Sequence, residues 1–138
     1  LITVRDALGL KTEIIGVVAE GAPAYALSFE KGEVVSTNTA DTIADGVACR
    51  VPSAEAFEII KNGAARVIRV SDDEIMDAMG VYFTDTHNLA EGAAATPLAG
   101  LMKESDIQAG RKVGLILSGG NADRDTFTRV MEHLGGTA

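Results

Sequence analysis

Short runs of apolar, partly β-branched residues predict three strands in this chain. Residues 13–18 and 112–117 are apolar enough for strands buried on both faces, and residues 66–70 form a shorter run. Between them, apolar residues recur at helical spacing over residues 2–8 and 22–30, after Ser53, after Ser71 and near the end of the chain. Because strands and helices alternate, the pattern predicts an α/β fold with a largely parallel sheet.

Helix starts are marked by local signals. Ser53 can cap the helix that carries Phe57, and residues 71–74 (SDDE) form a capping box before a helix with Ile75, Met79 and Phe83 on its buried side. Proline is tolerated in the first turn of a helix but not in its interior. We therefore expect a helix that begins with Thr96 as cap and Pro97 as first residue, with residues 90–95 as a separate turn.

Composition and charge exclude several classes of function. The 138 residues carry a net charge of −8, with no basic cluster, which disfavours binding to nucleic acids and to anionic membrane surfaces. The single cysteine, Cys49, cannot form an internal disulfide, and no apolar run approaches the ~18 residues of a membrane span. We expect a cytoplasmic location.

Three polar segments are candidates for chemistry. Residues 118–121 (SGGN) follow a predicted strand and precede a helix, where parallel sheets bind ligands, although the same residues suit a tight turn with Asn121 as a helix cap. Residues 85–92 combine His87 with carboxylates, either as an acid/base cluster or as a solvated loop. Residues 41–46 suit a turn, and both His133 and Cys49 suit structural roles.

Four segments together resemble one family. Residues 42–47 (TIADGV), 70–75 (VSDDEI), 88–93 (NLAEGA) and 117–121 (LSGGN) occur in the order and spacing of pyridoxal-phosphate-dependent threonine/serine dehydratases and serine racemases. The resemblance covers essentially the whole chain. It implies that residues 1–138 are the carboxyl-terminal part of the large domain of a three-layer, tryptophan-synthase-β-like enzyme.

The resemblance also implies roles for individual residues. Ser118 would hydrogen-bond the pyridine nitrogen of pyridoxal 5′-phosphate, and Glu91 would lie near the cofactor ring. The backbone around Asp45 and Gly46 would line the site. Gly119 and Asn121 complete the cofactor-binding set that we expect.

Other family features are missing from the sequence. The Schiff-base lysine has no counterpart, because none of the five lysines lies in the family's lysine context: Lys11, Lys31, Lys61, Lys103 and Lys112. The glycine-rich phosphate loop has no counterpart either. Val18 and Ala24 stand where racemase-like members carry cation-binding carboxylates, so we expect no metal site. The chain starts at Leu1, inside a helical pattern, and we expect a fragment that is inactive alone.

The parent protein is therefore expected to be an ammonia-lyase that converts a β-hydroxy amino acid to a 2-oxo acid and ammonia. Its expected partners are the small amino-acid substrate, the missing amino-terminal half and further copies of itself. A serine or amino-acid racemase of the same family is an alternative parent. A third possibility is a remnant that lacks the Schiff-base lysine and binds or assembles without catalysis.

Overall fold

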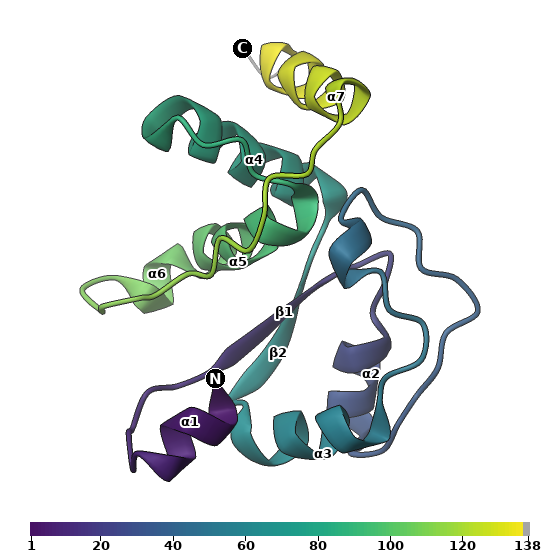
Figure 1. The fold of residues 1–138 in the computed structure, drawn as a ribbon, viewed down its shortest axis with the longest axis vertical. Coiled ribbons are helices and arrows are strands. Elements are labelled where there is room, and N and C mark those ends of the chain that lie inside the picture. The colour runs from purple at the N-terminus through teal and green to yellow at the C-terminus, as the bar shows by residue number, and fades with distance from the viewer. Residues whose placement is uncertain (137–138) are drawn as a thin grey trace.

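Helices and two strands alternate along the chain, as the computed structural model shows for residues 1–136 (Figure 1). The elements are α1 (Ile2–Ala7), β1 (Ile15–Ala19), α2 (Ala24–Lys31), the 3-10 turn η1 (Asp45–Val47), α3 (Ala54–Gly63), β2 (Arg66–Val70), α4 (Asp72–Thr86), α5 (Gly92–Lys103), α6 (Ser105–Gln108) and α7 (Arg124–Gly135). The predicted strand at residues 66–70 is confirmed. So are the cap at Ser53 and the capping box of Ser71 and Glu74.

The two strands lie side by side and parallel. Their register pairs Ile15 with Arg66 and Ala19 with Val70. A parallel pair needs a long crossover connection, which α2, the irregular segment after it and α3 supply here. The predicted α/β class with a parallel sheet is confirmed.

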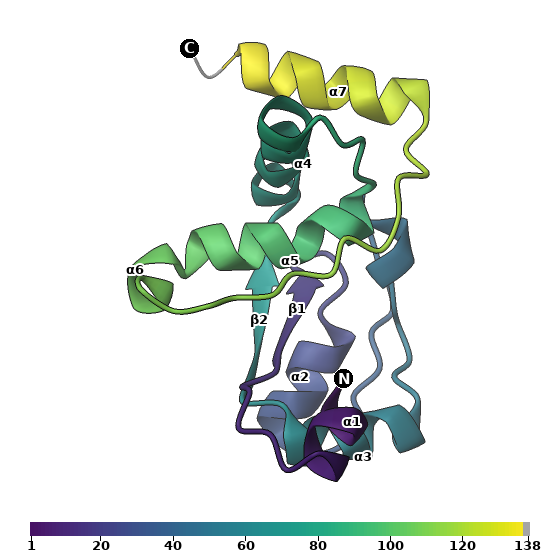
Figure 2. The same ribbon diagram turned by 60° about the vertical axis from the view of Figure 1, so that its left-hand side comes forward.

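Helices cover both faces of this sheet and give the layered arrangement (Figures 1 and 2). Helix α2 packs on β2 from one side, and α5 packs on both strands from the other. Helix α4 then packs on α5, and α7 lies across α4. The core lies between these elements, and its largest fully buried side chains include Val70, Ile75, Met79 and Val130.

The prediction of a buried strand at residues 112–117 is wrong. In the structure these residues belong to an irregular segment, residues 109–117, which we call the strap; it follows α6 and runs back along α5 (Figure 2). Val113 and Ile116 are 45% and 55% exposed. The reason is the lack of a neighbour at hydrogen-bonding distance, because a cavity separates the strap from the open edge of β1.

The expected helix start at Thr96 and Pro97 is wrong, and so is the alternative in which Asn121 caps the last helix. Helix α5 begins at Gly92, with Glu91 at its N-cap, and runs through Pro97 instead of starting there. The Thr96 hydroxyl donates to the Gly92 carbonyl within that first turn, at 2.9 Å. At the final helix, Asp123 is the cap that accepts from Thr126 N, two residues after Asn121.

Among residues 1–136, no helix combines the length and the apolar character that crossing a bilayer requires.

Candidate functional site

Residues 118–121, which we call the ligand loop, are fastened to the start of α5 by Glu91. The backbone N–H of Glu91 donates to the Gly119 carbonyl at 3.2 Å. The Glu91 carboxylate in turn accepts from Asn121 N at 3.0 Å. We call this two-way contact the Glu91 clasp. It fixes the ligand loop to the N-terminus of a helix that is itself packed on the sheet.

Close packing leaves little room for a side chain at either glycine of the ligand loop, and it requires glycine at residue 120. A Cβ atom on Gly119 would lie 2.8 Å from the Glu91 carboxylate, and one on Gly120 would lie 2.4 Å from the backbone carbonyl of Leu89. The Leu89 carbonyl belongs to the main chain, so it cannot move aside as the end of a side chain can. The pair of glycines therefore lets the loop approach α5 closely enough for the clasp to form.

Residues 42–46, which we call the clamp loop, approach the same helix end from another direction. Ala44 is fully buried, and a Cβ on Gly92 would lie 3.0 Å from both the Ala44 Cα and the Ile43 carbonyl oxygen. A Cβ on Gly46 would lie 2.8 Å from the Ala93 Cβ. Small residues on both sides thus bring the backbone at Asp45 and Gly46 against the first turn of α5.

The structure therefore gathers the predicted site residues around the N-terminus of α5. Ser118, Gly119 and Asn121 lie on one side with Glu91, and Asp45 and Gly46 lie on the other. Ser118 is exposed, and no hydrogen bond of its hydroxyl to another of the described residues is recorded. A free hydroxyl at the end of a loop that is otherwise fixed is available to a ligand.

The acid/base interpretation of residues 85–92 is not supported by the geometry. His87 ends α4 in the left-handed conformation, with φ of 56°, and is exposed. His133 instead lies 3.0 Å from Asp77 and ties α7 to α4, consistent with a structural role. Of the 85–92 segment, it is Glu91 that contacts the ligand loop.

Two carboxylates with lowered pKa values, Glu104 and Glu74, lie in ion pairs that hold the layers together. The hydrogen bond from Arg66 lowers the pKa of Glu104, against the opposing effect of burial. Burial alone would raise the pKa of Glu74, but hydrogen bonds from the Ser71 backbone and from Lys103 outweigh it and lower that pKa. These groups stabilise α5 against β2 and α4, and they do not contact the ligand loop.

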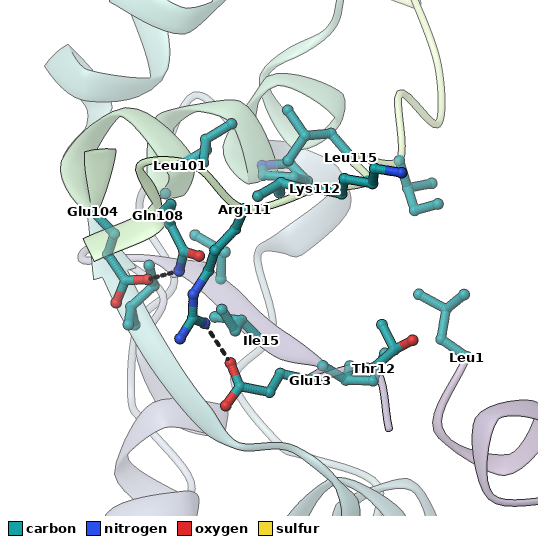
Figure 3. Close-up of a pocket in the computed structure, with 18 of the residues that line it drawn as sticks. Leu1, Thr12, Glu13, Ile15, Leu101, Glu104, Gln108, Arg111, Lys112 and Leu115 are labelled. Carbon is teal, nitrogen blue, oxygen red and sulfur yellow. Dashed lines mark hydrogen bonds and ion pairs between the residues drawn. The ribbon is translucent and has the colours of Figure 1, made fainter. Parts of the chain in front are cut away.

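A cavity of about 840 Å³ lies at the open edge of β1, separate from the ligand loop (Figure 3). We call it the β1 groove, and its apolar lining includes Ile15, Val17, Ile68, Leu101, Val113 and Leu115. Arg111 crosses it to an ion pair with Glu13 at 2.9 Å, which Figure 3 shows as a dashed line. An unpaired strand edge flanked by apolar side chains can bind a further segment of polypeptide.

Comparison with known proteins identifies the family. The model of the pyridoxal-phosphate dependent enzyme family matches residues 2–119, and the chain belongs to that family. An L-threonine ammonia-lyase from Geobacter sulfurreducens is 37% identical over 119 residues, covering 86% of this chain and 30% of the relative.

Solved structures agree on the fold. The processed threonine deaminase isoform 2 from Solanum lycopersicum matches with a TM-score of 0.88 at 27% identity, over 97% of this chain and 40% of the other. The serine racemase from Dictyostelium discoideum matches with a TM-score of 0.76 at 33% identity, over 88% and 39%. The chain thus spans 30% to 40% of the length of these three proteins.

The residues at this site fit one end of the family's cofactor. The free Ser118 hydroxyl is a neutral group that can donate to an aromatic nitrogen, and the Glu91 clasp holds it in place. No lysine among the described residues has a recorded contact with Ser118, Glu91 or Asp45. Lys103 is at the opposite end of α5, about 18 Å from Glu91 at 1.5 Å per residue, and is paired with Glu74.

The sequence reasoning missed one pair of residues at this site. Asp72 lies in the capping-box segment and in the motif of residues 70–75, but neither predicts that its carboxylate accepts a hydrogen bond from the Thr42 hydroxyl at 2.5 Å. Thr42 belongs to a quoted motif, yet nothing in the local pattern links it to a residue 30 positions away. Only the packing of the clamp loop on α4 reveals the contact.

Proposed function

We propose that this chain is part of a pyridoxal-phosphate-dependent ammonia-lyase that converts a β-hydroxy amino acid, such as threonine or serine, to a 2-oxo acid and ammonia. The observation that carries the proposal is the ligand loop, fixed by the Glu91 clasp with the Ser118 hydroxyl left free. The similarity to a threonine ammonia-lyase and a threonine deaminase supports the same conclusion.

The residues of this chain hold and tune the cofactor. When bound, pyridoxal phosphate supplies an electron sink for the electrons of a bond broken at the substrate α-carbon. Ser118 donates a hydrogen bond to the pyridine nitrogen without adding the negative charge that would keep that nitrogen protonated. Glu91 keeps Ser118 in position, and the backbone at Asp45 and Gly46 forms the wall beside the ring. With no carboxylate beside that nitrogen, the cofactor held by Ser118 would supply a weaker electron sink, which suits elimination.

The lysine that carries the cofactor, and the loop that binds its phosphate, come from another part of the protein. The β1 groove supports this division, because it offers an unpaired strand edge and apolar walls to an added segment. The chain alone is therefore inactive. We use "complete protein" for this chain together with the part that supplies the lysine.

Substitution of Ser118 in the complete protein tests the proposal. Ser118→Ala leaves the pyridine nitrogen without its partner, at a cost of roughly 1–3 kcal/mol, which corresponds to roughly a 5- to 150-fold loss of turnover. Ser118→Asp favours the protonated ring and shifts products from elimination toward racemisation or transamination. Turnover, product analysis and the absorption spectrum of the bound cofactor measure these effects.

The control is Ser53→Ala, which removes the cap of α3 far from the ligand loop. It costs ~1 kcal/mol of stability and leaves turnover per folded molecule unchanged. If Ser118→Ala behaves like Ser53→Ala, then Ser118 is only a turn residue and the proposal is wrong.

A racemase is the second candidate, favoured by the match to the Dictyostelium serine racemase. The two activities differ in their products. Incubation of the complete protein with L-serine yields pyruvate and ammonia from a lyase, whereas D-serine as the main product would support the racemase.

A further inference from the structure

We propose that Asp72 is a positioning residue for the cofactor site, acting through Thr42 on the clamp loop. This role rests on the proposed function, because the clamp loop matters through the site wall that it forms. Asp72 lies at the first position of α4 and is half-buried.

Two side chains hold three consecutive residues of the clamp loop. The Thr42 hydroxyl donates to Asp72 Oδ1 at 2.5 Å, and the backbone N–H of Ile43 donates to Asp72 Oδ2 at 3.1 Å. The Thr42 oxygen then accepts from Ala44 N at 3.1 Å. Both carboxylate oxygens are used, and bonds to a charged acceptor are stronger than neutral ones.

The fixed residues lead directly to the wall of the site. Ala44 packs against Gly92 in the first turn of α5, and η1 starts at the next residue, Asp45. A shift of residues 42–44 therefore moves the backbone at Asp45 and Gly46 relative to Glu91. Because Glu91 also holds the ligand loop, this contact sets the spacing between the two sides of the site.

The clamp loop needs such an anchor because its surroundings are irregular. Between the end of α2 at Lys31 and the start of α3 at Ala54, the short turn η1 is the only helical or strand element described. Asp41 is tied to Gly21 by a backbone bond of 3.0 Å, but that contact lies before the clamp loop. Asp73 and Glu74 share the first turn of α4, so a favourable charge at the helix start does not depend on Asp72.

A pair of substitutions at Thr42 isolates the contact. Thr42→Val keeps the shape but removes the hydroxyl that bridges Asp72 and Ala44, whereas Thr42→Ser keeps it. A second pair compares Asp72→Asn with Asp73→Asn, which removes the same charge from the same turn without touching the loop. The readouts are hydrogen exchange of residues 42–46 in this chain and affinity for pyridoxal phosphate in the complete protein, followed by its absorption.

We expect Thr42→Val and Asp72→Asn to speed exchange at Ile43 and Ala44 about tenfold and to weaken cofactor binding by about 5- to 10-fold, as the loss of one hydrogen bond predicts. Thr42→Ser and Asp73→Asn should match the wild type in both. A merely structural contact would lower the urea midpoint of Thr42→Val and leave cofactor affinity unchanged, and that result would overturn the proposal. If the wild-type complete protein binds no pyridoxal phosphate, the proposed function itself is wrong.

Discussion

Strand β1 and the strap are similarly apolar in sequence, yet only one of them forms a strand. Residues 15–19 pair with β2 along their whole length, and Ala19 at their end is fully buried. Residues 112–117 line the β1 groove, and three of their apolar side chains, Val113, Ile116 and Leu117, are more than 40% exposed. The difference is the neighbour, because a strand gains its hydrogen bonds only from an adjacent one. An apolar run therefore indicates a tendency to form a strand, and the strand forms only where another strand lies beside it.

The largest expected difference concerns core packing. Ile75 of α4 is fully buried, so Ile75→Ala should lower the free energy of unfolding by about 2–5 kcal/mol. Ile116→Ala in the strap removes a similar side chain from an exposed position and should change it by less than about 0.5 kcal/mol. Urea unfolding of both variants measures the contrast. Equal losses would mean that the strap is packed in solution.

The ion pair between β2 and the end of α5 should contribute more to stability than the ion pair that the strap makes with Glu13. Arg66 holds Glu104 with two hydrogen bonds, at 2.9 and 2.5 Å, in a place where the Glu104 side chain is 15% exposed. Glu104→Gln should cost about 1.5–3 kcal/mol. Glu13→Gln breaks the exposed pair with Arg111 and should cost about 0.2–1 kcal/mol. Chemical unfolding at pH 7 gives both values, and a larger cost for Glu13 would contradict the comparison.

The Arg66–Glu104 pair also predicts a dependence on pH. Because the pKa of Glu104 is lowered from 4.5 by its bond from Arg66, the folded state binds this proton less readily than the unfolded state does. The contribution to stability is therefore complete above pH 4.5 and is lost as the pH falls through the lower folded pKa. Thermal melts between pH 3 and pH 7 should show a smaller acid loss in Glu104→Gln than in the wild type.

The smallest difference is expected between a helix cap and the ligand loop. Ser71→Ala removes half of the capping box at the start of α4 and should cost ~1 kcal/mol. Ser118→Ala changes a hydroxyl that makes no hydrogen bond to residues 1–136 and should leave the unfolding midpoint unchanged. Thermal melts of this chain compare the two. A clear loss for Ser118→Ala would show that its hydroxyl stabilises the ligand loop itself.

Local signals predicted the parts of the fold that depend on neighbours in sequence. Ser53 and Ser71 are caps as expected, since a cap bonds backbone groups two or three residues away. The helix start predicted at Pro97 was wrong, because an alanine-rich turn that packs through Gly92 on Ala44 extends α5 on its N-terminal side. The caps were predicted because their partners are close in sequence, whereas the start of α5 depends on a contact between Gly92 and Ala44, which are far apart in sequence.

At the site, too, features carried by sequence motifs were predicted, whereas a contact between distant residues was not. Motif order brought Ser118, Glu91 and Asp45 into one hypothesis, and the structure places them around one helix end. The contact of Asp72 with Thr42 was beyond the sequence pattern, because its residue type already had a sufficient local explanation at the start of α4.

The Glu91 clasp has a consequence for the order in which the protein is made. It joins residue 91 to residues 119 and 121, so α5, α6 and the whole strap must leave the ribosome before the ligand loop can dock. The clamp loop and both strands are synthesised earlier, because all of their residues precede position 71. A nascent chain that stops before residue 119 contains the residues of both strands and of α1 to α6 but cannot form the clasp.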